Sequence, residues 1–318
     1  MYQSSHLSPS SIPSTSSDRF RADAPLNING KAIYSTKGAA REYGRIGCNF
    51  YVGCPHDCAY CYLKRGASSK HLGGTEVRLK KCFKDEMDAL DVFCKEVQKH
   101  IGILQKTGVF FSFTTDPMID ETRSLTFSAV GVLCDLGIPV RVLTKSAGWW
   151  CRKRELMLLE NMARCGDNVQ FGWTLTGRDD MEPNASRNLD RIEEMRRVKE
   201  IGLKTFASIE PVIDWQVAKD MVICSLEYCD HYMIGLRSGV RKDYYNPDES
   251  AYCISQITDM INNQNKTVYL KNSTRKLLRQ RLSPSAMGYL LSHTVDMDGI
   301  PIPYPPVPYD AVSQHSSS

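Results

Sequence analysis

Three closely spaced cysteines are the part of this sequence with the clearest chemistry. Cys54, Cys58 and Cys61 stand in the run Gly-Cys-Pro-His-Asp-Cys-Ala-Tyr-Cys-Tyr, which has a C-x3-C-x2-C spacing. Three thiolates in one loop suit three irons of a [4Fe–4S] cluster, and the fourth iron then has no protein ligand in the motif. An iron with an open position can bind a small molecule, so the spacing predicts a reactive cluster rather than a simple electron carrier.

A zinc site is the alternative interpretation of the same loop. His56 lies between the first two cysteines, and Cys48 lies a short distance upstream. Structural zinc sites typically contain C-x2-C pairs and further ligands at fixed spacing, which this loop matches only in part. The spacing favours the cluster, with zinc as the second interpretation.

The elements that must position these cysteines alternate along the chain. Short apolar runs rich in β-branched and aromatic residues indicate strands, and stretches with helical periodicity separate them. The predicted strands are Asn49–Val52, Val77–Lys81, Val109–Thr114, Val140–Thr144, Val169–Leu175, Lys204–Ile209, His231–Leu236 and Thr267–Leu270. The predicted helices are Lys84–Leu104, Arg123–Leu136, Arg152–Cys165, Ala185–Ile201, Gln216–Tyr228 and Glu249–Asn262. Such β-α units in series predict an α/β fold with a parallel sheet and helices outside it.

Polar residues follow four successive predicted strands. These strand ends carry Thr114-Thr115-Asp116-Pro117, Thr144-Lys145-Ser146, Thr176-Gly177-Arg178-Asp179 and Glu210-Pro211. The carboxyl ends of parallel strands meet on one side of a sheet, so we expect a shared polar pocket there. Asp116 and Glu210 are its candidate catalytic carboxylates, although a turn residue is the simpler explanation for any one of them.

The cysteine loop resembles the signature of the radical S-adenosylmethionine (SAM) superfamily, C-x3-C-x-aromatic-C, with Tyr60 as the aromatic residue. The resemblance implies a partial (β/α)6 TIM-type barrel, which we prefer to an open doubly wound sheet because no G-x-G-x-x-G follows the first strand. It also implies that SAM binds the open iron of a [4Fe–4S] cluster. Cleavage of SAM would then yield a 5′-deoxyadenosyl radical that abstracts hydrogen from a substrate.

The strand-end motifs are similar to those of the spore photoproduct lyase-like, or DNA repair photolyase-like, group over about residues 46–215. This resemblance implies that Lys145 binds the SAM carboxylate. It places Thr115 near the SAM amino group, Thr174 near the ribose and Tyr60 near the adenine. Phe113 departs from the group's pattern, because the lyase carries a hydrogen-donating cysteine close to that position, so thymine-dimer repair is in doubt.

The ends of the chain differ in composition from its centre. Residues 1–25 are rich in Ser and Pro and are expected to be disordered, residues 26–285 form the predicted barrel, and residues 286–318 form a Pro-rich tail that ends in Ser. No apolar run approaches the ~18 residues of a membrane span, and no signal peptide is evident. With 12 cysteines in 318 residues and no secretion signal, we expect a cytoplasmic protein in a reducing compartment, with no membrane partner.

An acid-free basic stretch bears on the substrate. Between Met260 and Val295 there is no Asp or Glu. The basic residues there are Lys266, Lys271, Arg275, Lys276, Arg279 and Arg281. Such a stretch fits a phosphate-bearing partner, so DNA or RNA is the expected substrate, although a solvated helix face would look the same.

Other assignments stay open at this stage. The substrate could instead be a peptide or a small metabolite, and the chain could be a non-catalytic cluster or zinc protein that binds nucleic acid. Because no second cysteine cluster is evident, we expect the electron to come from a flavodoxin- or ferredoxin-type donor.

Overall fold

The computed structural model describes residues 26–66, 69–149, 152–241 and 243–295. The predicted disordered segment 1–25 and most of the Pro-rich tail lie outside these residues. The predicted start of that tail falls within a helix, α10 (Pro284–Ser292). None of the described helices is long and apolar enough to cross a membrane.

One sheet carries the fold, and its order within the described residues is β1-β2-β5-β6-β7-β8-β9-β10. These strands are Ile33–Ser35, Ile46–Cys48, Val109–Phe111, Val140–Thr144, Val169–Thr174, Lys204–Val212, His231–Leu236 and Thr267–Leu270. All neighbours from β2 to β10 are parallel, and β1 is antiparallel to β2. The spatial order follows the chain without reversal, which confirms the α/β partial barrel and excludes the doubly wound sheet.

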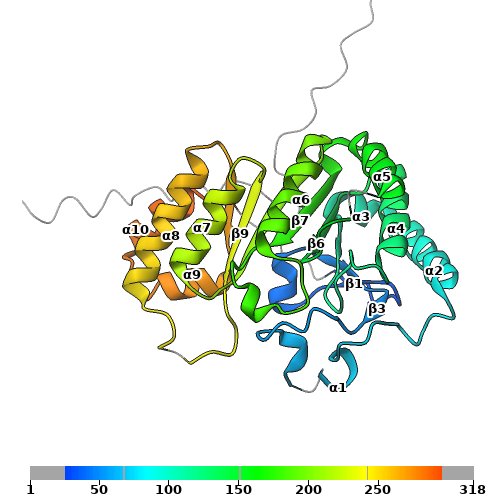
Figure 1. Ribbon diagram of the computed structural model, residues 1–318, viewed down its shortest axis with the longest axis horizontal. Helices are drawn as coiled ribbons and strands as arrows, with labels where there is room; N and C mark the ends of the chain where they lie inside the picture. The colour runs from blue at the N-terminus through cyan, green and yellow to red at the C-terminus, as the bar shows by residue number, and fades with distance from the viewer. Residues whose placement is uncertain (1–25, 67–68, 150–151, 242, 296–318) are drawn as a thin grey trace, which may run out of the picture.

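Helices fill the crossovers between the parallel strands and lie outside the sheet (Figure 1). They are α2 (Glu86–Lys99), α3 (Ile101–Thr107), α4 (Arg123–Asp135), α5 (Lys153–Ala163), α6 (Asn188–Glu200), α7 (Trp215–Ser225) and α8 (Pro247–Asn262). The predicted helix Lys84–Leu104 is divided at His100 into α2 and α3. The sequence interpretation missed α9 (Asn272–Leu278) and α10, which follow the last strand.

The start of the barrel differs from the prediction. The first parallel strand is Ile46–Cys48, not Asn49–Val52. The chain leaves the main sheet after Cys48, and β3 (Tyr51–Val52) pairs with β4 (Arg78–Leu79) in a separate two-stranded sheet. The predicted strand Val77–Lys81 is therefore a short partner of β3, and this pair flanks the cysteine loop.

The barrel interior has its own apolar floor. Phe110, Phe206, Met233, Tyr269 and Val295 form a buried cluster separate from the larger core between sheet and helices. Gly172 makes room for this floor, since a Cβ there would lie 2.3 Å from the Phe206 ring.

Side chains, rather than strand pairing, join the two ends of the open sheet. The 3-10 helix η1 (Gly38–Glu42) lies between β1 and β2 and ends in the buried Glu42. The Glu42 carboxylate accepts hydrogen bonds from the Tyr269 hydroxyl (2.8 Å) and the Asn272 amide (2.6 Å). The C-terminal segment also approaches the last strand of the sheet. Within the described residues its contribution is Val295, whose amide donates to the Val268 carbonyl at 2.9 Å.

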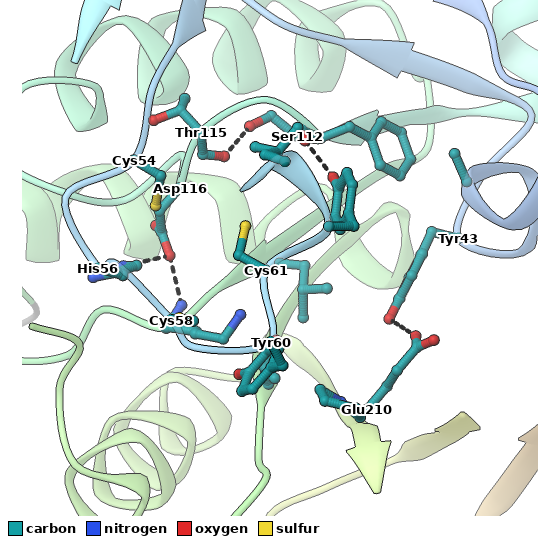
Figure 2. Close-up of a pocket in the computed structure, with 18 of the residues that line it drawn as sticks. Tyr43, Cys54, His56, Cys58, Tyr60, Cys61, Ser112, Thr115, Asp116 and Glu210 are labelled. Carbon is teal, nitrogen blue, oxygen red and sulfur yellow. Dashed lines mark hydrogen bonds and ion pairs between the residues drawn. The ribbon is translucent and has the colours of Figure 1, made fainter. Parts of the chain in front are cut away.

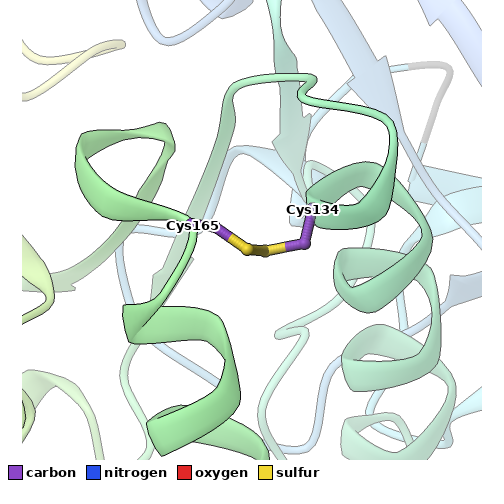
Figure 3. The surroundings of a disulfide bond; sticks show 2 residues. All are labelled: Cys134 and Cys165. Atoms are coloured by element: carbon purple, nitrogen blue, oxygen red, sulfur yellow. A yellow bond between two sulfur atoms is a disulfide. The ribbon is translucent and has the colours of Figure 1, made fainter.

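A disulfide links the ends of two outer helices (Figure 3). Cys134 in α4 is bonded to Cys165, which follows α5, with a Cα–Cα distance of 5.9 Å. Cys134 lies within the predicted helix Arg123–Leu136, where a cysteine ordinarily packs as a small, free apolar side chain. The sequence alone could not bring it beside Cys165.

Candidate active site

A cavity of about 490 Å³ opens at the carboxyl ends of the parallel strands. The structure brings every residue predicted for the site onto its wall, namely Cys54, Cys58, Tyr60, Cys61, Thr115, Asp116, Lys145, Thr174 and Glu210. In Figure 2 the cysteine loop occupies the left and centre of the cavity, and Glu210 lies on the right with Tyr43. The cavity has the size of pockets that hold cofactors and small ligands.

Backbone contacts fix the cysteine loop. Gly53 has a φ of 82°, and a Cβ there would lie 2.0 Å from the Glu76 carbonyl oxygen, so this position requires glycine. The Cys54 amide donates to the Gly74 carbonyl at 3.0 Å, and the Ala59 amide donates to the Met181 carbonyl at 2.9 Å. The loop is therefore held at both of its ends.

The three loop thiols are free. Burial raises the pKa of Cys54 to about 12 and also raises the pKa of Cys58. Thiolates in such a place need a positive partner, which iron would supply.

Within the described residues, no three His, Cys, Asp or Glu side chains converge where one ion could sit. A zinc ion would need its ligands around one point, whereas each thiolate of a [4Fe–4S] cluster would bind a different iron. Cys48 is fully buried on β2 and is not among the cavity residues, so the proposed fourth zinc ligand is missing from the wall.

Asp116 anchors the loop to the sheet. Its Oδ2 lies 2.9 Å from His56 Nε2 and accepts from the Lys145 amide at 2.7 Å, while Oδ1 accepts from the Thr144 hydroxyl at 2.6 Å. Burial opposes ionisation of Asp116, but His56 and these hydrogen bonds lower its pKa to about 2. His56 is thereby engaged on both sides, since its Nδ1 lies 3.2 Å from the Asn184 carbonyl.

Lys145 presents an uncompensated ammonium to the cavity. Within the described residues its Nζ makes no hydrogen bond or ion pair, and its nearest recorded partner is the Tyr60 ring at 5.6 Å. Burial opposes this charge, but the neighbouring Cys58 and Glu182 raise the pKa of Lys145. The Thr115 hydroxyl is likewise buried without a hydrogen-bond partner. Both groups are suited to a polar ligand.

A buried ion pair holds Tyr60. The Tyr60 hydroxyl donates to Glu182, and the Arg191 guanidinium lies 2.7 Å from the same carboxylate, with neither charged side chain exposed. Arg191 also donates to the Thr174 carbonyl at 2.8 Å. The sequence interpretation assigned no role to Glu182 or Arg191, because their contact joins a loop to α6 through tertiary folding.

The right-hand side of the cavity contains residues that sequence reasoning missed. The Lys271 ammonium lies 2.5 Å from Glu210 and 3.9 Å from the Tyr43 ring centroid. The Tyr43 hydroxyl bonds to Ser208 at 2.7 Å and donates to Glu210. The signal for Lys271 was its place directly after a strand, the same signal that identified Lys145.

Lys271 also changes the interpretation of the basic stretch. Its side chain is 2% exposed and points into the barrel, so it is not part of a surface. Arg275 donates to the Leu270 carbonyl at 2.6 Å, and Arg281 lies 3.3 Å from Asp248. Lys276 and Arg279 are nevertheless exposed, so Lys271 is the member of the stretch that the barrel withdraws from the surface.

Comparisons with known proteins do not assign a family to this chain. No protein-family model matches the sequence, and no curated protein matches it significantly. Among solved structures, Streptococcus suis SuiB bound to S-adenosylmethionine is similar over 69% of this chain and 44% of that chain, with 12% identity and a TM-score of 0.46. SuiB bound to precursor peptide SuiA is similar over 67% of this chain and 45% of that chain, with 13% identity and a TM-score of 0.45.

A radical SAM methyltransferase from Sphaerobacter thermophilus is similar over 72% of this chain and 67% of that chain, with 14% identity and a TM-score of 0.41. In the two comparisons with SuiB, the match covers less than half the length of the SuiB chain. Similarity at this level carries no conclusion about activity.

Proposed function

We propose that the protein is a radical SAM enzyme in which Cys54, Cys58 and Cys61 hold a [4Fe–4S] cluster. The observation that supports this most is the shared cavity, where three free thiols face the same space as an unpaired ammonium and an unpaired hydroxyl. Once reduced by one electron from an external donor, the bound cluster would cleave SAM to methionine and a 5′-deoxyadenosyl radical, which would remove a hydrogen atom from the substrate.

The protein's own groups orient SAM in this proposal. Lys145 binds the SAM carboxylate as a fixed cation, and the Thr115 hydroxyl hydrogen-bonds the amino-acid end. Tyr60, which Glu182 holds in place, packs near the adenine, and Thr174 lies near the ribose. Phe110, which belongs to the buried apolar floor of the barrel, also lines the cavity and would limit the access of water from that side.

Asp116 and Glu210 receive different roles. Asp116 has both carboxylate oxygens engaged by His56, Thr144 and the Lys145 amide, so it positions the cysteine loop and the Lys145 strand end. Glu210 faces the cavity from the other side and is the candidate that meets the substrate.

The finer assignment to the DNA repair photolyase-like group has less support. Phe113 lines the cavity where that group would have a thiol nearby, and a phenyl ring is a poor hydrogen donor. Lys271 is buried, but Lys276, Arg279 and Arg281 are exposed, so DNA or RNA stays a candidate substrate beside a peptide or a small metabolite. We further propose a flavodoxin- or ferredoxin-type electron donor and a cytoplasmic location.

The test is SAM cleavage by the anaerobically reconstituted protein under dithionite, measured as 5′-deoxyadenosine. We expect Lys145→Ala to lower cleavage about 10- to 100-fold at limiting SAM, because a charged hydrogen bond contributes ~1.5–3 kcal/mol. Iron content should not change, and Lys153→Ala, which removes an exposed lysine, should cleave normally. Normal cleavage by Lys145→Ala would remove the proposed role of Lys145. A wild-type protein that never cleaves SAM would support the rival, a non-catalytic cluster or zinc protein.

A further inference from the structure

Three successive strand ends form the cavity wall that lacks cysteines. Glu210 lies near the end of β8, Arg237 directly follows β9, and Lys271 directly follows β10. All three line the cavity. None of them is needed for the cluster or for the amino-acid end of SAM in the proposal above, so this wall is available to the substrate.

Glu210 and Lys271 neutralise one another. Their ion pair is 2.5 Å long, and Tyr43 donates a further hydrogen bond to the same carboxylate. Burial and the nearby Glu210 raise the pKa of Tyr43 well above its usual value, so Tyr43 keeps its proton. The pair is therefore a fixed, neutral arrangement whose carboxylate is partly open to the cavity.

Arg237 has no such counter-charge. Its Nε is buried and makes no hydrogen bond, and no ion pair of its guanidinium is found within the described residues. The backbone around it is nevertheless held, because the Arg237 amide donates to the Tyr245 hydroxyl at 2.8 Å and that hydroxyl donates to the Val212 carbonyl at 2.5 Å. A positioned cation with an unsatisfied buried N–H is costly unless a ligand completes it.

We propose that Arg237 binds an anionic oxygen group of the substrate, either a carboxylate or a phosphoryl group. Arginine presents paired N–H donors that match both groups. This inference rests on the proposed function for the reaction, because Lys145 is taken to hold the carboxylate of SAM and Arg237 is then left for the substrate. The anion would bind beside Glu210, which can accept a hydrogen bond from a neighbouring donor on the same molecule.

The volume of the cavity limits the size of the substrate that can bind there. Its volume of about 490 Å³ must hold SAM as well as the reacting part of the substrate. The wall therefore suits a small anionic metabolite, or the anionic reactive end of something larger, rather than a long polymer segment.

The test titrates the reconstituted full-length protein with inorganic phosphate and, separately, with acetate, by calorimetry. We expect saturable binding of at least one anion, weakened about 10- to 100-fold by Arg237→Gln, which corresponds to the loss of a charged hydrogen bond. Tighter binding of phosphate would identify a phosphoryl group on the substrate, and tighter binding of acetate would identify a carboxylate. Arg237→Lys should bind with intermediate strength, because it keeps the charge but not the paired donors.

Arg241→Gln is the matched control, since it removes an exposed arginine from the same loop. Equal anion binding by wild type and Arg237→Gln, or no saturable binding by wild type, would overturn the inference. Loss of SAM binding in Arg237→Gln would also overturn it, because Arg237 would then serve SAM. If the wild type binds anions at Arg237 but never cleaves SAM, the proposed function fails while the anion site stands.

Discussion

Gly235 is a residue on which the substrate wall of the cavity depends. A Cβ at Gly235 would lie 2.6 Å from Glu210 Cδ and 2.9 Å from Lys271 Cδ, so the ion pair occupies the space of a side chain. We expect Gly235→Ala to lower the free energy of unfolding by about 1–3 kcal/mol through overpacking. It should also displace Glu210 while leaving the iron content unchanged.

Chemical denaturation and iron analysis check this prediction. Gly131→Ala is the control, because a Cβ at Gly131 in α4 meets nothing within 4 Å. That variant should be neutral or stabilising by up to ~1 kcal/mol. A Gly235→Ala protein as stable as Gly131→Ala would contradict the close packing of the pair.

At this scale the sequence predicted which residues meet, but not what holds them. Residues at the carboxyl ends of parallel strands are expected to share one pocket, and Asp116, Lys145 and Glu210 do line one cavity. The partners of these residues come from distant segments, as Tyr43 does for Glu210 and Glu182 does for Tyr60. No local pattern marks such pairs, because tertiary folding alone makes them neighbours.

At the scale of elements, Asp230 fixes the start of β9 to α6 and β8. Its Oδ1 accepts from the Lys199 ammonium at 2.5 Å, and its Oδ2 accepts from the Thr205 amide at 3.0 Å. Burial opposes ionisation of Asp230, but these two donors lower its pKa. A carboxylate with a lowered folded-state pKa stabilises the fold above its usual pKa, and this contribution is lost as the pH falls through the folded-state value.

Asp230→Asn should therefore lower the free energy of unfolding by about 1 kcal/mol at pH 7. The difference from wild type should shrink once the pH falls below ~4, where Asp230 of the unfolded chain begins to be protonated, and should vanish as the pH passes the lowered folded-state pKa. Urea titrations at several pH values measure this. A difference that persists unchanged at low pH would show that the charge of Asp230 is not its source.

The strands were predicted best where a buried apolar run is bounded by polar residues. The strands Val140–Thr144, His231–Leu236 and Thr267–Leu270 match their predicted bounds, because each is a buried run with polar flanks. The prediction that the apolar run Asn49–Val52 is the first strand of the parallel sheet was wrong, since β3 pairs with β4 outside the main sheet. Apolar composition indicates burial, and it does not say which neighbour provides it.

At the scale of the whole molecule, the barrel is an open sheet spanned by side chains from η1 and from Tyr43, the residue that follows it. Tyr43 reaches Ser208 and Glu210, and Glu42 reaches Tyr269 and Asn272. The same segment thus closes the barrel and completes the wall that we assign to the substrate. The cysteine loop lies across the cavity from it, so the proposed radical source and the substrate would meet inside the barrel (Figure 2).

The most direct test of this account is the iron and sulfide content of the anaerobically reconstituted protein, together with its spectrum after reduction. We expect about four irons per chain, lost when Cys54, Cys58 and Cys61 are all replaced by Ala. Replacement of three other free cysteines, Cys82, Cys224 and Cys253, should retain the iron. A protein that binds zinc and no iron, or equal iron in the two triple variants, would contradict the cluster and with it the proposed function.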